Sequence, residues 1–189
     1  VNSCNDAANV KGMSNTRWYN NTFYQDRSPS QTWRPLFFIY DNTDSGYNSP
    51  ARGTKIKNNI FYLKYRDVPA IGLGQTDNRT NFECDYNVYW CEDGDHTPKF
   101  TIAGTTYSWD QWRALGYDTH SVVVNPNFNN FTDFVPATRL DYGTNLGTEF
   151  QTGLSTSATW TVGTAPATTV QNGTWQVGAR IYAAVTVVI

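Results

Sequence analysis

The chain has 189 residues, a net charge of −2 and only 16% charged residues. This length suits one domain with a sizeable core, and the charge balance offers no basic face for a nucleic-acid partner. Lys and Glu are scarce, whereas Thr, Asn, Gly and aromatic residues are abundant. The composition excludes a helical bundle and favours short strands joined by turns.

Three segments share one pattern, in which β-forming residues precede an Asn that is followed by apolar and aromatic residues. They are NTRWYNNTFYQ, GTKIKNNIFYL and FECDYNVYW, at residues 15–25, 53–63 and 82–90. Alignment of Asn21, Asn59 and Asn87 spaces the repeats by 38 and 28 residues, a range typical of stacked repeat units. Asn tolerates the left-handed backbone of a sharp corner, and stacked Asn side chains can hydrogen-bond to one another. We therefore predict equivalent corners of adjacent coils for these three residues.

Two further apolar segments, PLFFIYD at residues 35–41 and VPAIGLG at residues 68–74, are typical of strands. Asp, Asn, Gly and Pro fill the loop between the first of them and the next repeat, which is standard turn chemistry.

A single helix is predicted over residues 109–115, because Ser108 and Gln111 form a capping box and Gly116 provides a stop. Trp112 and Leu115 lie three residues apart and share one face. We expect this face to be buried and the helix to lie outside the stacked strands.

The chain changes character near its end. From Asp141 onward it is rich in Thr, Gly and Ala, and residues 174–189 are β-branched and apolar. We predict a closing pair of strands there. The expected organisation is a set of coils over residues 1–142 and a cap or subunit-interface region over residues 143–189.

An ordered series of segments carries a family resemblance. In chain order the segments are KIKNNIFY, DYNVYW, KFTIAGTTYS, SWDQWRALG, YDTHSVVVNPNF, DFVPATRLDYGTNLG and VGARIY. From about residue 53 onward the chain resembles the C-terminal part of pectate-lyase-like proteins, the right-handed parallel β-helices of secreted polysaccharide-active enzymes and phage tail spikes. It departs from the family at residues 137–141, which read ATRLD where the family commonly has Ser-Pro-Ala-Ile-Asp, and it has fewer coils than full-length members.

The resemblance implies an all-β fold: a right-handed parallel β-helix solenoid of three to four coils, with one short external helix and a C-terminal capping strand region. It also implies that the chain is the end of a longer solenoid, and that it is secreted or lies on a cell surface or virion. A compact β-sandwich sugar-binding module is the competing fold if the repeats are accidental.

Two functions follow from the resemblance. The first is a carbohydrate-engaging segment, with a polysaccharide or glycan as partner, at the end of a lyase- or glycosidase-type protein. The second is a structural or adhesive fibre, filament or tail-spike protein without catalysis, in which the chain forms a homo-oligomer. Whether the chain is an enzyme stays open; a polysaccharide lyase or glycoside hydrolase is the class expected if it is one.

Aromatic residues supply the candidates for sugar binding, because flat rings suit the apolar faces of sugars. The candidate carbohydrate-binding residues are Trp18, Tyr24, Trp33, Tyr89 and Trp90.

Catalytic residues are not identified by the sequence. Glycoside hydrolysis needs a carboxyl pair, which Asp67, Asp77, Glu83 and Asp85 could supply across neighbouring coils. A lyase needs a base, for which Lys55, Lys57, Lys64 and Arg66 are candidates, but an ordinary polar outer face explains these cations better. Of the two histidines, His120 is better explained as structural than as a base.

One metal site is predicted. Asp93 and Asp95 flank Gly94 and present two carboxylates across a turn, which is half of a calcium site; a solvated loop explains them better, because loop carboxylates are mostly surface charges. No other cofactor is expected. Cys4, Cys84 and Cys91 cannot form a complete disulfide framework, and the sequence leaves open whether Cys84 and Cys91 pair or remain thiols.

Overall fold

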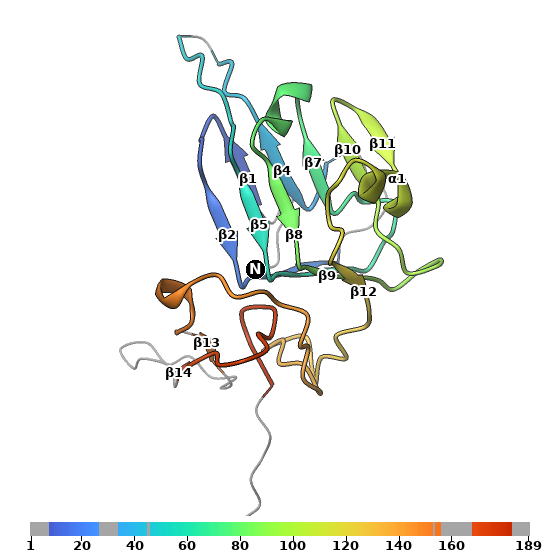
Figure 1. Ribbon diagram of the computed structural model, residues 1–189. Helices are drawn as coiled ribbons and strands as arrows, with labels where there is room; N and C mark the ends of the chain where they lie inside the picture. Colours follow the sequence, from blue (N-terminus) through green and yellow to red (C-terminus); the bar gives the residue numbers. More distant parts are fainter. Residues whose placement is uncertain (1–7, 27–33, 45, 153, 156–167, 183–189) are drawn as a thin grey trace, which may run out of the picture.

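A computed structural model of the chain describes residues 8–26, 34–44, 46–152, 154–155 and 168–182. Within them the protein is predominantly β, with one α-helix, α1 (Trp109–Ala114) (Figure 1). None of the helices in the described part is long and apolar enough to cross a membrane.

Three sheets of mainly parallel strands make up most of the structure. One has the order β1-β4-β7-β10-β11, the second β2-β5-β8 and the third β3-β6-β9-β12. The bounds are β1 (Ala8–Lys11), β2 (Arg17–Tyr19), β3 (Thr22–Gln25), β4 (Phe37–Tyr40), β5 (Lys55–Lys57), β6 (Ile60–Leu63), β7 (Ile71–Leu73), β8 (Glu83–Asp85), β9 (Val88–Cys91), β10 (Phe100–Ile102), β11 (Thr105–Tyr107) and β12 (Val122–Val123). Two short 3-10 helices, η2 (Thr76–Arg79) and η3 (Thr148–Phe150), and the antiparallel pair β13 (Leu154–Ser155) and β14 (Thr168–Thr169) complete the described elements.

The chain visits the three sheets in the same order three times, as β2-β3-β4, β5-β6-β7 and β8-β9-β10. We call each round a pass. Every strand of one pass pairs in parallel with its equivalent in the next. This arrangement confirms the expected all-β fold with stacked repeats, and it is compatible with a β-helix.

One apolar core is shared by the three sheets. Side chains alternate along each strand, so that Phe37 and Ile39 of β4 are buried while Phe38 and Tyr40 are half-buried on the other face. Aromatic rings of successive passes stack inside this core, with centroid distances of 4.8 Å between Phe23 and Phe61 and 5.1 Å from Phe61 to Tyr89.

The three repeat Asn residues form a hydrogen-bonded ladder, in which Asn59 and Asn87 are buried and Asn21 is half-buried. Asn21 Nδ2 donates to Asn59 Oδ1 at 3.0 Å, and Asn59 Nδ2 donates to Asn87 Oδ1 at 3.0 Å. The prediction that they occupy equivalent corners of adjacent passes is confirmed. The left-handed residue at each corner is, however, the preceding one, with φ of 55° at Asn20 and 58° at Asn58. The bend falls one residue earlier and leaves the ladder side chain free to point inward.

We expect Asn59→Ala to lower the free energy of unfolding by about 2–4 kcal/mol, because it leaves several buried polar groups without a hydrogen-bond partner. Asn59 Nδ2 also donates to the carbonyls of Trp18 and Lys57, both at 2.9 Å. Urea denaturation of Asn59→Ala beside the exposed control Asn129→Ala measures this effect. Equal stability of the two variants would contradict the role of the ladder.

The predicted helix is present, with the capping box intact: Ser108 Oγ accepts from the Gln111 N–H, and Gln111 Oε1 accepts from the Ser108 N–H. Trp112 is fully buried and Leu115 is half-buried against the core. Trp112 stacks on Phe100 of β10 with centroids 4.4 Å apart. The helix therefore covers the end of the core beside the last pass rather than an outer sheet face (Figure 1).

The chain beyond residue 140 returns along the outer face of the β3-β6-β9-β12 sheet. Val177 packs with Ile60, Val88 and Leu140 in a second apolar cluster. Within residues 170–182 the expected closing strands are represented only by isolated bridges such as Gly143 to Trp175; residues 183–189 lie outside the described part. The described segment covers a sheet face, whereas α1 covers the end of the core.

Candidate functional site

A hollow of about 490 Å³ lies on the outer face of the sheet that contains β4, β7, β10 and β11. Phe38, Gly72 and Thr101 are register partners on β4, β7 and β10, and Phe38 and Thr101 line the hollow. Thr106, the register partner of Thr101 on β11, also lines it. The volume is in the range of small-molecule sites, so this is the candidate binding site.

Two glycines beside the hollow, Gly72 of β7 and Gly74 just after it, allow neighbouring side chains to approach the backbone closely. A Cβ added to Gly72 would collide with Pro35 and lie 2.7 Å from Thr101 Oγ1. A Cβ added to Gly74 would lie 2.7 Å from Tyr40 Cβ and 3.4 Å from Phe38 Cζ. Neighbouring side chains therefore lie directly over these two positions, and only glycine permits this approach.

An aromatic ring lines one side of the hollow. Phe38 stacks on Tyr40 of the same strand, with centroids 4.8 Å apart and an interplanar angle of 27°. Tyr40 thus supports one face of the half-buried Phe38 ring, and Phe38 lines the hollow.

An ion pair lies in the same lining. Lys99 Nζ donates to Asp67 Oδ1 at 2.7 Å. Hydrogen bonding to Lys99 and its positive charge hold the pKa of Asp67 below the ordinary value. Asp67 is thus suited to accept hydrogen bonds at neutral pH and poorly suited to act as a proton donor.

A second polar surface covers the outer face of β2-β5-β8. Lys55 and Lys57 both contact Glu83, at 2.6 and 2.7 Å. The hydrogen bond that Lys55 donates to Glu83 raises the pKa of Lys55, and the hydrogen bonds from Lys55 and Lys57 lower the pKa of Glu83. A lysine that acts as the base of a lyase needs a lowered pKa, and a glutamate that acts as the acid of a glycosidase needs a raised one. The pKa values of Lys55 and Glu83 are each shifted in the opposite direction.

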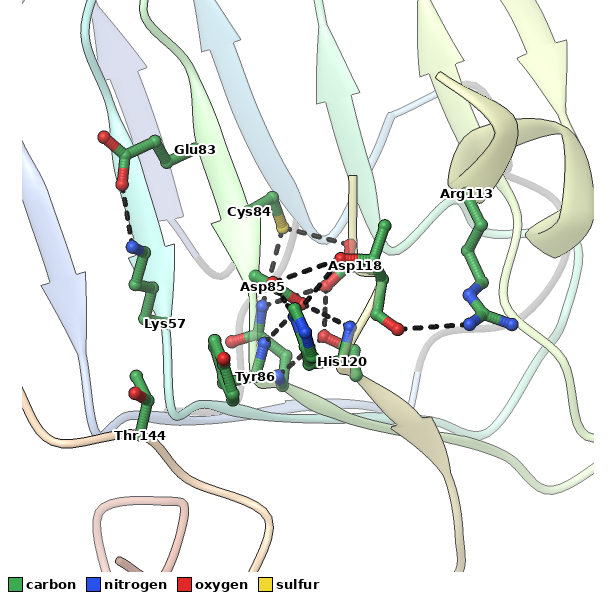
Figure 2. Close-up of polar contacts among 12 residues, drawn as sticks. Lys57, Glu83, Cys84, Asp85, Tyr86, Arg113, Asp118, His120 and Thr144 are labelled. Carbon is green, nitrogen blue, oxygen red and sulfur yellow. Dashed lines mark hydrogen bonds and ion pairs between the residues drawn. The ribbon is translucent and has the colours of Figure 1, made fainter. Parts of the chain in front are cut away.

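A histidine–carboxylate pair lies beside these charges (Figure 2). His120 Nδ1 and Asp85 Oδ2 are 2.7 Å apart, and the His120 backbone N–H donates to Asp85 Oδ1 at 2.7 Å. The imidazole stacks on Tyr86 with centroids 4.7 Å apart and an interplanar angle of 3°. The carboxylate fixes the orientation of the ring and directs Nε2 away from Asp85, which is the geometry of an oriented imidazole. A smaller hollow of about 240 Å³ beside the pair is lined by Lys57, Glu83, Asp85 and Tyr117, among others.

No protein-family model, curated protein or solved structure matches this chain.

The predicted sugar-binding residues are divided between two environments. Tyr24 and Trp90 lie on the outer face of the β3-β6-β9-β12 sheet, on either side of Tyr62 in the strand register. Trp18 packs toward the core against Phe37, with centroids 5.0 Å apart. Tyr89 is fully buried, and Trp33 lies outside the described residues.

Adjacent strand residues point to opposite faces, so the sequence could have shown that Tyr89 and Trp90 do not share one surface. Tyr24 and Trp90 remain candidates for glycan contact. Trp90 is half-buried and stacks on His96 with centroids 4.0 Å apart.

The predicted calcium ligands are engaged by an arginine. Asp95 Oδ2 accepts from Arg66 Nη2 at 3.0 Å, and Asp93 Oδ1 accepts from the Arg66 backbone N–H at 2.7 Å. Calcium takes six to eight oxygen ligands, and the described residues contain no group of three or more His, Cys, Asp or Glu that could hold a metal ion. These residues fit an internal ion pair better than calcium, and a calcium ion there stays a prediction.

The two described cysteines are buried thiols. Cys84 and Cys91 are free and do not pair with each other; Cys4 lies outside the described residues. Burial raises the pKa of Cys91 to about 12 and the pKa of Cys84 well above its ordinary value. Neither thiol is therefore activated as a nucleophile.

Proposed function

We propose that this chain is a carbohydrate-engaging segment of a right-handed parallel β-helix protein. In this proposal it is the C-terminal end of a pectate-lyase-like, polysaccharide-active protein that is secreted or displayed on a cell surface or virion. The parallel passes and the Asn ladder support the fold. The hollow over β7 supports the function, since it combines a ring face with hydroxyl and charged groups.

The hollow on the β4-β7-β10-β11 face is the observation on which the proposal rests. Phe38 offers a ring for the apolar face of a sugar, Thr101 and Thr106 offer hydroxyls, and Asp67 and Lys99 offer a charged acceptor and donor. Sites that bind small polar molecules combine an apolar wall with a few placed polar groups, and this lining has that composition.

The proposed role is to bind and present a glycan rather than to cleave it. Lys55, Glu83 and Asp67 have pKa values displaced away from base or acid catalysis. If the full protein is a lyase or glycoside hydrolase, its chemistry belongs to other coils, and the hollow serves as a subsite.

A blocking substitution tests the binding site with a matched control. Thr106 and Thr105 are exposed neighbours on β11, and only Thr106 lines the hollow. We expect Thr106→Trp to weaken oligosaccharide binding at least tenfold, measured by calorimetry against a panel of oligosaccharides, and Thr105→Trp to leave it unchanged. Phe38→Ala should weaken binding about tenfold through loss of ring stacking.

Equal affinity of the Thr105 and Thr106 variants would move the binding site away from the hollow. No binding of any oligosaccharide, together with assembly of the wild-type chain into stable oligomers or fibres, would favour the structural or adhesive alternative. Chemical-shift changes in the wild-type protein on ligand addition locate the site independently of any variant.

A further inference from the structure

The two charged side chains that line the hollow neutralise each other. Among the described residues, Asp67 and Lys99 are the only charged ones in its lining, and their ion pair spans 2.7 Å. Both side chains remain accessible, with 64% of Asp67 and 33% of Lys99 exposed. A ligand in the hollow therefore meets a paired acceptor and donor with no net charge.

We propose that the hollow is selective for an uncharged glycan, and that the Asp67–Lys99 pair recognises two neighbouring hydroxyl groups of one sugar ring. One hydroxyl donates to Asp67, and the adjacent hydroxyl accepts from Lys99. This inference rests on the proposed carbohydrate-binding function and adds the substrate class.

The hydrogen-bonding capacity of the pair supports this recognition. The ion pair uses Asp67 Oδ1 and one of the three ammonium hydrogens of Lys99. Among the described residues no hydrogen bond is made to Asp67 Oδ2, which leaves an acceptor beside a donor. Hydrogen bonds to charged groups are stronger than those between neutral groups, so both hydroxyls would be held firmly.

The same pair disfavours an acidic sugar. A uronate or sulfate that approached Lys99 would face the negative charge of Asp67 at close range, and like charges in contact reduce affinity. To bind, the acidic ligand would have to displace Asp67 from Lys99. The hydrogen bond to Lys99 keeps the pKa of Asp67 low, so this carboxylate stays ionised at neutral pH and the repulsion persists.

The remaining lining matches an uncharged sugar as well. Phe38 and Pro35 provide apolar contact, and Thr101 and Thr106 provide hydroxyls that both donate and accept. None of these four side chains carries a charge that would neutralise the charge of an acidic ligand.

The proposal is tested with neutral and acidic oligosaccharides of equal length, titrated into the full chain by NMR. The probes are gluco-, manno- and xylo-tetraose on one side and tetragalacturonate on the other. We expect the wild type to bind at least one neutral probe more tightly than tetragalacturonate. Asp67→Asn removes the anion and releases Lys99, so it should weaken the neutral probe about tenfold and strengthen tetragalacturonate about tenfold.

Asp141→Asn is the matched control, because Asp141 forms an exposed ion pair with Arg139 at 2.7 Å and does not line the hollow. It should leave both affinities unchanged. Lys99→Gln should weaken the neutral probe without any gain for tetragalacturonate, which separates the loss of the ion pair from the release of a cation.

The possible outcomes are distinguishable. A wild type that prefers tetragalacturonate, or an Asp67→Asn variant with an unchanged ratio of affinities, overturns the selectivity while the carbohydrate-binding function stands. Failure of every probe to bind counts against the carbohydrate-binding function itself.

Discussion

Replacement of Trp112 by alanine is expected to lower the free energy of unfolding by about 3–5 kcal/mol, as for other fully buried aromatic residues. Trp112 stacks on Phe100 at 4.4 Å and contacts Tyr117 at 4.6 Å between centroids. Its indole N–H donates to Asp118 at 2.7 Å. The substitution thus opens a cavity at the end of the core and also removes a hydrogen bond from a buried carboxylate.

Thermal and urea denaturation of Trp112→Ala measure this loss. Trp109→Ala is the control on the same helix, because Trp109 is half-buried and should cost less. A melting temperature equal to that of the wild type would show that α1 does not hold the last pass in place.

The second large effect is expected for Asp118→Asn, at about 3 kcal/mol or more, since donors would be left without an acceptor in the core. Oδ2 of Asp118 accepts from Trp112 Nε1 at 2.7 Å and from Tyr89 Oη at 3.1 Å. Oδ1 accepts from Ser121 Oγ at 2.5 Å and Asn87 Nδ2 at 3.1 Å. An amide places an NH₂ group against donors, and the indole N–H cannot reverse its role.

Asp77→Asn serves as the control, because 80% of the Asp77 side chain is exposed, and it should change stability by less than about 0.5 kcal/mol. Burial raises the pKa of Asp118, while hydrogen bonds from Ser121, Trp112 and Asn87 oppose that rise. If Asp118→Asn were as stable as the wild type, the carboxylate would not be the acceptor that ends the Asn ladder.

Local sequence patterns were sufficient for the repeats and the helix. Asn21, Asn59 and Asn87 recur with similar neighbours, and their ladder needs only that equivalent residues lie above one another. The Ser108 and Gln111 capping box depends on residues three apart, so it too is readable from the chain. The position of the helix at the end of the core depends on the contacts of Trp112 with Phe100 and Asp118, which a local sequence pattern does not reveal.

The hollow could not be predicted, because it combines residues from separate passes. Phe38, Gly72 and Thr101 become neighbours only through the register of three strands. Gly72 and Gly74 in the apolar segment of residues 68–74 were the available signal, since glycine in or beside a strand marks a close approach of neighbouring groups. The abundance of aromatic residues instead made Tyr89 a candidate for sugar binding, whereas its neighbour Trp90 occupies the opposite face of the sheet.

The Asn ladder also shows that the geometry of the stack does not depend on the number of residues in each pass. The ladder residues are 38 residues apart in one step and 28 in the next, yet each step makes the same amide-to-amide contact at 3.0 Å. Extra residues are accommodated in connections outside the core, as between β4 and β5. In such an architecture a loop can be lengthened, or a whole pass exchanged, without disturbing the neighbouring passes. New functional side chains can therefore be introduced on the surface while the interior packing is unchanged.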